Sequence, residues 1–386
     1  MAAKLLVGVV VLAAALATLL VASRESAGIP AAGAQGDRPS PVMLAFSATG
    51  RAPPVSEVFV VREDGSTSQL THEHVLLEVG AWSPDMQRIL VWGAWPSGQG
   101  LAHGLATVSL RTGEVQRLWR VRTGNMQGAV WSSTVGRIAF LGNGHLYVIS
   151  PNGDDLHDLS PAGLIGQAEV AGLTLAPNGK QIAASVHLRC GSRIVVANLS
   201  STAPAQNVSG ACSRAGRAAR FDDFQPSWSP ATGRIAFTRE TRVRTDLYEV
   251  ESSHARPERY RLRGITQPRS PAWSPALSPP VRLAFHSDQG LYLYDPLPST
   301  HSLVRLTATS PIDGSVAWSP DASHIAFASH RGSAATNLTI LDLERPFRVV
   351  DVSGDYQSVV GQPAWREPTA GSTSPVVARN ALLATE

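Results

Sequence analysis

A tryptophan-centred phrase recurs along the chain about every 44 to 53 residues, and this period constrains the fold more than any other feature. Each copy except the last is followed by an apolar phrase such as Ile138-Ala139-Phe140, then by another such as Leu146-Tyr147-Val148-Ile149, and then by a fourth short run. Four short β-rich runs between turn residues are typical of one four-stranded blade, so the sequence predicts an all-β propeller. The clearest copies of the tryptophan phrase are Ala81-Trp82-Ser83-Pro84-Asp85, Ser227-Trp228-Ser229-Pro230, Ala272-Trp273-Ser274-Pro275 and Ala317-Trp318-Ser319-Pro320-Asp321.

The first and last copies of the repeat are incomplete in complementary ways. Leu44-Ala45-Phe46 has no tryptophan phrase before it, and Ala364-Trp365-Arg366 has no strands after it. We therefore expect the strand around Trp365 to pair with the strand around Leu44-Ala45-Phe46, because this closes the ring and removes an open sheet edge. This interpretation gives a seven-bladed propeller of four-stranded antiparallel sheets, and the alternative is six blades with a spare segment.

Turn residues fall where the hairpins of a blade require them. The Ser-Pro-Asp triplets and Pro177-Asn178-Gly179 separate the first and second strands of a blade, and Glu63-Asp64-Gly65 and Pro151-Asn152-Gly153 separate the third and fourth. Proline presets one turn dihedral and glycine supplies the positive φ of a tight turn. The recurrent tryptophan and phenylalanine side chains are predicted to pack between blades, since aromatic side chains bury large areas.

The order Trp-Ser-Pro-Asp, Ile-Ala-Phe and Leu-Tyr-Val-Ile resembles the WD-like β-propeller repeat of the TolB type. The resemblance extends over roughly residues 42–366. It implies a propeller of the kind found in envelope binding proteins and in prolyl-oligopeptidase-like peptidases. TolB carries an α/β domain before its propeller, whereas here residues 41–46 already begin the first blade, so the resemblance is to the repeat.

The amino-terminal segment is predicted to be a hydrophobic helix. Leu5–Val21 runs 17 residues without a charge, which is longer than most signal-peptide cores and shorter than most spanning helices. Both a cleaved signal peptide and a retained membrane anchor therefore stay open for residues 1–23, and both place the rest of the chain outside the cytoplasm, in the periplasm or at the cell surface. Residues 24–40 are expected to be a linker, 41–366 the propeller, and 367–386 a flexible tail.

Composition and motifs exclude several classes of protein. The chain is 43% apolar and its net charge is only +3, which excludes intrinsic disorder and argues against nucleic-acid binding. It has no Gly-x-Ser-x-Gly elbow, phosphate loop or His-Glu-x-x-His motif, and His72-Glu73-His74 has no recognisable third ligand, so no metal and no cofactor are expected. Cys190 and Cys212 map to the same face of one blade and are predicted to form a disulfide, with two free thiols as the alternative.

Many of the segments joining second to third strands, and one blade to the next, are long and are predicted to be irregular loops on one face. They include Gly93–Gly104, Val186–Arg193, Gly210–Pro226 and Arg239–Thr245. Trp95 and His103 are candidate exposed contact residues, the alternative being a loop tucked over its blade. Six arginines are the other candidates, either as a patch for a carboxylate-rich or phosphate-bearing surface or as ordinary solvated side chains. These arginines are Arg214, Arg217, Arg220, Arg239, Arg242 and Arg244.

The function predicted from these features is a non-catalytic, extracytoplasmic binding scaffold for a protein or an anionic envelope component. The alternative is an enzyme of the lactonase or hydrolase kind that uses the central channel, although acids near the channel mouth such as Asp313 and Asp355 are isolated in the sequence. A sensory ectodomain that signals through the anchor is a third hypothesis, and it requires a partner to receive the signal.

Overall fold

The described residues of the computed structural model all belong to one compact unit, Ser40–Glu386. The predicted helix of residues 1–23, the linker of residues 24–40 and residues 368–386 of the tail lie outside them. In the described part, no helix is long and apolar enough to cross a membrane. The structure describes residues 42–49, 55–98, 100–121, 126–162, 164–166, 172–210, 221–275, 281–296, 302–308, 316–330, 336–344, 348–352, 356 and 358–367.

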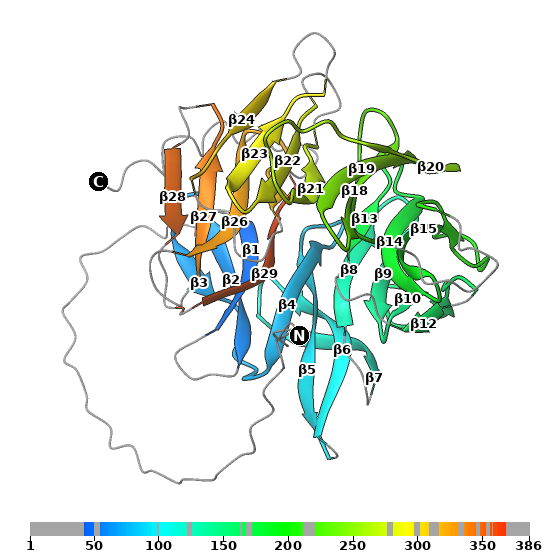
Figure 1. Ribbon diagram of the computed structural model, residues 1–386. Helices are drawn as coiled ribbons and strands as arrows, with labels where there is room; N and C mark the ends of the chain where they lie inside the picture. Colours follow the sequence, from blue (N-terminus) through cyan, green and yellow to red (C-terminus); the bar gives the residue numbers. More distant parts are fainter. Residues whose placement is uncertain are drawn as a thin grey trace, which may run out of the picture. The chain divides into compact units, whose positions relative to one another are not determined.

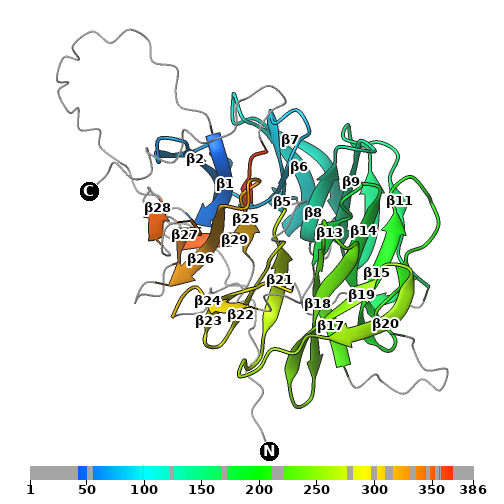
Figure 2. The ribbon, with the colours of Figure 1, turned by 90° about the horizontal axis from the view of Figure 1, so that it is seen from above.

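The described residues form an all-β propeller of small sheets, which follow one another in chain order in Figure 1 and Figure 2. The largest sheet has eight strands in the order β29-β1-β2-β4-β5-β6-β7, with β3 paired to β2. One parallel pair, Ser56 with Leu76, joins β2 to β4. These strands are β29 (Ser358–Trp365), β1 (Val42–Thr49), β2 (Ser56–Arg62), β3 (Thr67–Gln69), β4 (Leu76–Trp82), β5 (Arg88–Ser97), β6 (Gly100–Ser109) and β7 (Val115–Val121).

The other sheets each take consecutive strands of the chain, paired antiparallel. Two of them contain β8 (Met126–Ser132), β9 (Arg137–Gly142), β10 (His145–Ile149) and β11 (His157–Asp158), and then β12 (Leu164–Gly166), β13 (Leu173–Leu175), β14 (Gln181–Leu188), β15 (Gly191–Asn198) and β16 (Gln206–Asn207). The next contains β17 (Phe221–Trp228), β18 (Arg234–Thr241), β19 (Thr245–Glu251) and β20 (His254–Arg259). The last two contain β21 (Arg269–Trp273), β22 (Leu283–Ser287), β23 (Gly290–Tyr294) and β24 (Leu303–Arg305), and then β25 (Ala317–Trp318), β26 (His324–His330), β27 (Thr336–Asp342) and β28 (Arg348–Val352).

The two ends of the repeat pair with each other, as the sequence predicted. β29 lies antiparallel to β1, with Leu44 opposite Trp365 and Ala45 opposite Ala364. In Figure 1 the blue β1 accordingly lies beside the red β29. Because β1 is also paired with β2, the amino-terminal strand gains a partner on each side and has no open edge.

The second strand of each blade is apolar at successive positions because both of its faces are covered. Ile89 and Val91 pack in the same cluster as Val58 and Val60 of the preceding strands. Leu90, which points to the opposite face of β5, packs instead with Ile138 and Phe140 of the following sheet. The apolar phrase at the start of the second strand, here Ile89-Leu90-Val91 and Ile-Ala-Phe in other repeats, is therefore explained by the burial of both strand faces between two neighbouring sheets.

The turns between first and second strands use the predicted residues. The hydroxyl of Ser83 donates to Asp85 Oδ1 at 2.6 Å and accepts the backbone N–H of Arg88 at 2.9 Å, which fixes the turn before β5. Gly179 occupies the left-handed position of the corresponding turn with φ +65°. Ala322 adopts φ 57° at the equivalent position, although glycine is the residue that favours this conformation.

Three segments predicted as irregular loops are instead extended hairpins, so that part of the prediction is wrong. The β5–β6 ladder continues from Arg88 opposite Ser109 to Ser97 opposite Gly100, and it therefore includes most of Gly93–Gly104. Val186–Arg193 belongs to the β14–β15 hairpin and Arg239–Thr245 to the β18–β19 hairpin. Their polar and glycine residues pair through the backbone, which every residue except proline can do.

Candidate functional site

We call the side of the fold that carries the tips of β5–β6, β14–β15 and β18–β19 the hairpin face. All three hairpins join the second strand of a repeat to the third, so the alternation of strand direction places their tips on one side. The cyan β5–β6 hairpin projects furthest beyond its neighbours in Figure 1. This face was predicted from the sequence as the side with the longest connections.

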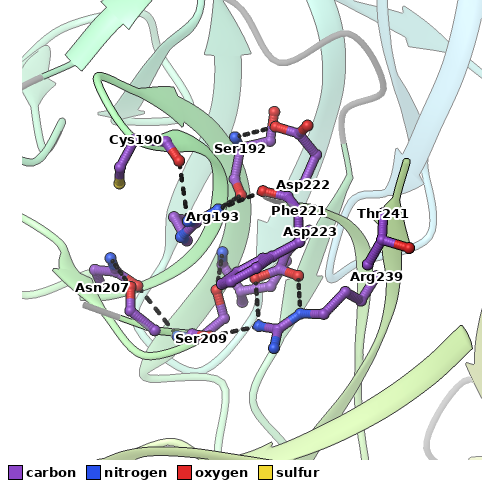
Figure 3. A network of polar contacts seen from close by, with 12 residues as sticks. Cys190, Ser192, Arg193, Asn207, Ser209, Phe221, Asp222, Asp223, Arg239 and Thr241 are labelled. Carbon is purple, nitrogen blue, oxygen red and sulfur yellow. Dashed lines mark hydrogen bonds and ion pairs between the residues drawn. The ribbon is translucent and has the colours of Figure 1, made fainter. Parts of the chain in front are cut away.

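A buried ion pair fixes the β18–β19 hairpin just below its tip (Figure 3). The Asp223 side chain of β17 is 0% exposed, and Arg239 of β18 contacts its two oxygens through Nε at 2.6 Å and Nη2 at 2.8 Å. Arg239 Nη2 also donates to the carbonyl oxygen of Ser209 at 2.6 Å. Burial raises the pKa of Asp223, and the Arg239 guanidinium opposes that rise. A bidentate Arg–carboxylate pair in this setting holds β17 and β18 in one geometry.

A second arginine extends this network to the β14–β15 hairpin. Arg193 is fully buried and donates from Nη1 to the carbonyl oxygen of Phe221 at 3.0 Å and from Nη2 to that of Cys190 at 3.0 Å. The guanidinium carbons of Arg193 and Arg239 lie 4.1 and 3.9 Å from the centre of the Phe221 ring. Burial lowers the pKa of Arg193. Two hairpins and the start of β17 are thereby tied together beneath the hairpin face.

The predicted six-arginine patch is therefore divided in the structure. Arg239 is only 11% exposed and belongs to the buried network. Arg242 and Arg244 lie exposed at the tip of the β18–β19 hairpin, where Arg244 contacts Asp246 at 2.8 Å. Between them Val243 is 89% exposed. Sequence reasoning missed Val243, although an aliphatic residue flanked by two arginines in a turn was visible there. Arg214, Arg217 and Arg220 lie outside the described residues.

The disulfide prediction is tested at one of its two ends. Cys190 is disulfide-bonded and buried at the tip of the β14–β15 hairpin. Its predicted partner, Cys212, lies outside the described residues, so the pairing stays a prediction.

Trp95 and His103 occupy the β5–β6 hairpin, but the expectation of an exposed tryptophan is wrong. Trp95 is 3% exposed, and the Arg117 guanidinium lies 5.3 Å from the centre of its ring. The spacing from Val91, which is also buried, indicated this, since residues four apart on a strand share a face. His103 is half-buried, and burial lowers its pKa, which favours a neutral ring at pH 7.

A small cleft beside the β18–β19 hairpin is lined by three arginines that sequence reasoning did not select. We call it the Arg cleft, and its volume is about 210 Å³. Arg261 and Arg263 are exposed, and Arg259 contacts Asp246 at 3.5 Å. The alternation of these arginines along the end of β20 and the link to β21 was the available signal. The cleft is lined by Asp246, Leu247, Arg259, Tyr260, Arg261, Leu262, Arg263, Ile265 and Pro268.

A central cavity of about 750 Å³ lies among the first strands of the repeats, including β4, β8, β17, β21 and β29. Six tryptophans line it: Trp82, Trp92, Trp131, Trp273, Trp318 and Trp365. Glu78 and Glu367 also line it, whereas its described lining contains no lysine, arginine or histidine. The predicted mouth residues Asp313 and Asp355 lie outside the described residues. Across the described part of the chain, no group of three or more His, Cys, Asp or Glu is placed to hold a metal ion.

Sequence comparisons find no match for this chain, neither to a family model nor to a curated protein. Solved structures do resemble it. TolB from Acinetobacter baumannii superposes with a TM-score of 0.52 at 16% identity, over 84% of this chain and 66% of TolB. An oligogalacturonate lyase in complex with manganese gives 0.55 at 12% identity, over 81% of this chain and 84% of the lyase. A puromycin-hydrolysing peptidase of Mycobacterium tuberculosis gives 0.52 at 14% identity, over 82% of this chain and 54% of the peptidase.

These likenesses define the class of protein. The chain is a β-propeller whose fold is similar to that of TolB, which agrees with the resemblance that the tryptophan phrases carry. At identities of 16% or less the likeness extends to the fold alone, and the three neighbours carry different names, one of them a peptidase and another a lyase. The function must therefore be argued from this chain's own surface.

Proposed function

We propose that this chain is a non-catalytic binding scaffold that works outside the cytoplasm, and that an acidic protein surface docks on its hairpin face. The observation that carries the proposal is Val243, an aliphatic side chain 89% exposed between Arg242 and Arg244. An exposed aliphatic residue ringed by positive charge favours a partner with an apolar contact and acidic surroundings.

The buried network below this tip supports the proposal because it limits the entropy lost on binding. The hairpin that presents Val243 is held just below its tip by Arg239 and Asp223, and the neighbouring hairpin is held by Arg193. A recognition element that is already ordered loses less conformational freedom when its partner docks. The Arg cleft adds Arg261 and Arg263 to the same side of the fold, which extends the positive surface.

The proposal includes seven blades. The eight-stranded sheet divides into β29-β1-β2-β3 and β4-β5-β6-β7, which share a single parallel residue pair, Ser56 with Leu76. Counted in this way, each sheet follows one period of the repeat. Residues 1–23 would carry the propeller across the membrane as a signal peptide or retained anchor, and a disulfide at Cys190 is compatible with an oxidising compartment.

The alternative, an enzyme working in the central channel, stays a prediction. The described lining of the central cavity supplies two carboxylates, Glu78 and Glu367, and they belong to different strand segments. No contact among the described residues favours a hydrolytic arrangement over a binding one.

The test is crosslinking of the tagged full-length chain in native envelopes, followed by binding of the captured partner in purified form. The variant Arg242→Glu/Val243→Asp changes the tip and leaves Arg239 and the Arg244–Asp246 pair in place. The matched control is Arg111→Glu/Leu156→Asp, which makes the same kind of change in turns between third and fourth strands, on the opposite side of the fold.

We expect the tip variant to weaken partner binding at least about tenfold, and we expect the remaining binding to lose its salt dependence. The control should bind as the unmodified chain does. Equal binding by both variants would remove the partner site from the hairpin tip. The absence of any specific partner in repeated captures would overturn the scaffold proposal itself.

A further inference from the structure

The Arg cleft carries more positive charge than its own residues neutralise. Its lining holds three arginines against one carboxylate, that of Asp246. Asp246 Oδ2 is shared, since it lies 2.8 Å from Arg244 Nε and 3.5 Å from Arg259 Nη1. Arg261 and Arg263 are exposed and form no ion pair or hydrogen bond with another residue of the described part of the chain. Two guanidinium groups of the cleft are therefore available to an anion from outside.

The apolar part of the lining is already packed. Leu247 is 1% exposed, and the partly buried Leu262 and Ile265 pack against the same core cluster, which includes Phe285 of β22. Pro268, at the end of the lining segment, is also buried. Because these side chains are held by the core, they lose little conformational freedom when a ligand binds.

The link that carries the two available arginines is fixed where it begins. The backbone N–H of Tyr260 donates to the carbonyl oxygen of Leu247 at 2.9 Å, and its hydroxyl donates to Glu249 Oε2 at 2.7 Å. Burial, with the neighbouring Glu249, raises the pKa of Tyr260 well above its usual value, so the hydroxyl adds no negative charge to the cleft at pH 7. Gly264, with φ +75°, supplies a left-handed turn directly after Arg263.

The number and geometry of the available charges favour a phosphomonoester. Such a group carries about −1.5 to −2 charges at pH 7, which matches two guanidinium groups, whereas a carboxylate carries one. A guanidinium donates two parallel hydrogen bonds to phosphate oxygens, so two arginines can hold one phosphoryl group. The cleft volume of about 210 Å³ is smaller than that of most drug-sized sites, and it suits a phosphoryl group with a short apolar stem.

We propose that the Arg cleft binds a phosphomonoester, with the phosphoryl group at Arg261 and Arg263 and the apolar stem against Leu262 and Ile265. The proposal goes beyond the docking of an acidic protein surface and does not depend on it, because a small molecule fills the cleft alone. A soluble phosphomonoester and the headgroup of phosphatidic acid share this chemistry, and the test separates the two sources.

The test titrates the full-length chain with three probes that share a phenyl ring: phenyl phosphate, phenyl sulfate and phenol. Binding is followed by calorimetry and ligand-observed NMR at one low ionic strength, because salt screens exposed charges. The phosphate and the sulfate have the same tetrahedral shape and differ in charge. We expect phenyl phosphate to bind saturably and about fivefold more tightly than phenyl sulfate, and phenol should not bind measurably.

Variants locate the site. Arg261→Gln/Arg263→Gln removes both available charges and should weaken phenyl phosphate binding at least about tenfold. The matched control is Arg111→Gln/Arg120→Gln, which removes two exposed arginines from the β6–β7 turn and from β7 and lowers the net charge equally. The control should bind phenyl phosphate as the unmodified chain does. Denaturation curves of both variants, recorded first, establish that a loss of binding is not a loss of fold.

Flotation with phosphatidylcholine vesicles, with and without phosphatidic acid, identifies the source of the phosphoryl group. Capture by phosphatidic acid that phenyl phosphate competes away would assign the site to a lipid headgroup. Phenyl phosphate binding without such capture would assign it to a soluble ligand, and each result supports the proposal. The tip variant Arg242→Glu/Val243→Asp should retain phenyl phosphate binding, so this proposal and the hairpin-tip proposal fail separately.

Three results would overturn the proposal. One is the absence of saturable phenyl phosphate binding. Another is equal affinity for phenyl phosphate and phenyl sulfate, which would leave a site for any small anion. The third is an unchanged phenyl phosphate affinity in Arg261→Gln/Arg263→Gln, since that variant retains the apolar lining and loses only the two charges.

Discussion

Two arcs of the propeller link neighbouring inner strands by different hydrogen bonds. In the first, which we call the indole-linked arc (β21, β25, β29 and β4), the tryptophan ring of one strand donates to a backbone carbonyl of the preceding strand. The three Nε1 to oxygen distances are 3.0 Å from Trp318 to Ala272, 2.9 Å from Trp365 to Ala317 and 3.0 Å from Trp82 to Ala364. The last of these bonds crosses the point where the two ends of the repeat meet.

In the second, the hydroxyl-linked arc (β13, β17 and β21), a side-chain hydroxyl accepts the backbone N–H of the next tryptophan. Trp228 donates to Thr174 Oγ1 at 3.3 Å, and Trp273 donates to Ser227 Oγ at 3.0 Å. The Trp228 ring turns to a carbonyl of its own hairpin, that of Gly233, at 3.0 Å. In the described part of the chain the buried Nε1 of Trp273 has no partner.

The comparison teaches that the residue before the tryptophan position influences which link forms. The residue before the tryptophan is alanine in the strands that accept an indole bond. In the other arc this place is taken by Ser227, which precedes Trp228, and by Thr174, which precedes Leu175 at the tryptophan position of β13. A hydroxyl there captures the next backbone N–H. Alanine permits the indole link without ensuring it, because Ala81 precedes Trp82 and yet Nε1 of Trp131 in the next sheet has no partner among the described residues. The hydroxyl-linked arc also carries the buried arginine network, which ties the same sheets together further out.

The largest expected effect comes from breaking that network. Asp223→Asn leaves the mostly buried Arg239 without its carboxylate, and losing one partner of a buried ion pair costs about 3–5 kcal/mol. We expect the free energy of unfolding, measured by urea denaturation with circular dichroism, to fall by that amount. Asp246→Asn removes the partly exposed pairs with Arg244 and Arg259 and should cost less than about 1 kcal/mol. Equal losses in the two variants would mean that the network contributes nothing beyond a surface pair.

A pH effect is expected at the seam between β17–β20 and β21–β24. His286 lies 3.2 Å from Ser270 Oγ, and Ser270 N–H donates to Thr238 Oγ1 of the preceding sheet at 3.0 Å. Burial, with a contribution from Arg269, lowers the pKa of His286 from 6.5 to about 4. The folded state therefore binds fewer protons than the unfolded chain between these two values, so stability is complete above pH 6.5 and falls as the pH drops toward 4.

The loss at pH 4 amounts to at most about 3 kcal/mol for this one group. His286→Gln cannot titrate, so its unfolding free energy should change less than that of the unmodified chain over the same pH range. The difference between the two pH profiles is the measurement, because it cancels the contribution of the carboxylates. Parallel profiles would show that His286 is protonated equally well in both states.

The fold was predictable because its signal repeats. Ring closure by Trp365 and Leu44, the turns at Ser83 and Gly179, and the packing of the tryptophans all follow from phrases that occur several times. The three hairpins could not be predicted, because their extension depends on backbone pairing. Gly93–Gly104, for example, lacks the alternation of apolar and polar residues that would indicate paired strands. The exception is Trp95, whose place four residues after Val91 did indicate burial.

The candidate site was harder to predict because charge in a sequence does not reveal its neighbours. Arg239, Arg242 and Arg244 look alike in the sequence, yet one lies beneath the surface and two lie on it. What separates them is Asp223, sixteen residues earlier on the adjacent strand, and strand register decides that contact. Glu78 was missed for a similar reason: only the assembled ring brings it to a cavity lined by tryptophans.

The smallest effect tests the comparison between the two arcs most directly. Trp365→Phe and Trp273→Phe make the same chemical change on equivalent inner strands. In the first, the Ala317 carbonyl loses its indole donor; in the second, a buried N–H without a partner disappears. Removing one partner of a buried hydrogen bond costs about 1–3 kcal/mol, whereas removing an unpaired donor relieves a cost of similar origin.

We therefore expect Trp365→Phe to lower the unfolding free energy by about 2 kcal/mol more than Trp273→Phe does. Urea denaturation of both variants, with equal slopes in the two transitions, provides the measurement. The loss of ring volume is common to both, so it cancels in the difference. If Trp273→Phe proved as costly as Trp365→Phe, its indole would have to hold a bond in solution, and the two arcs would be linked alike.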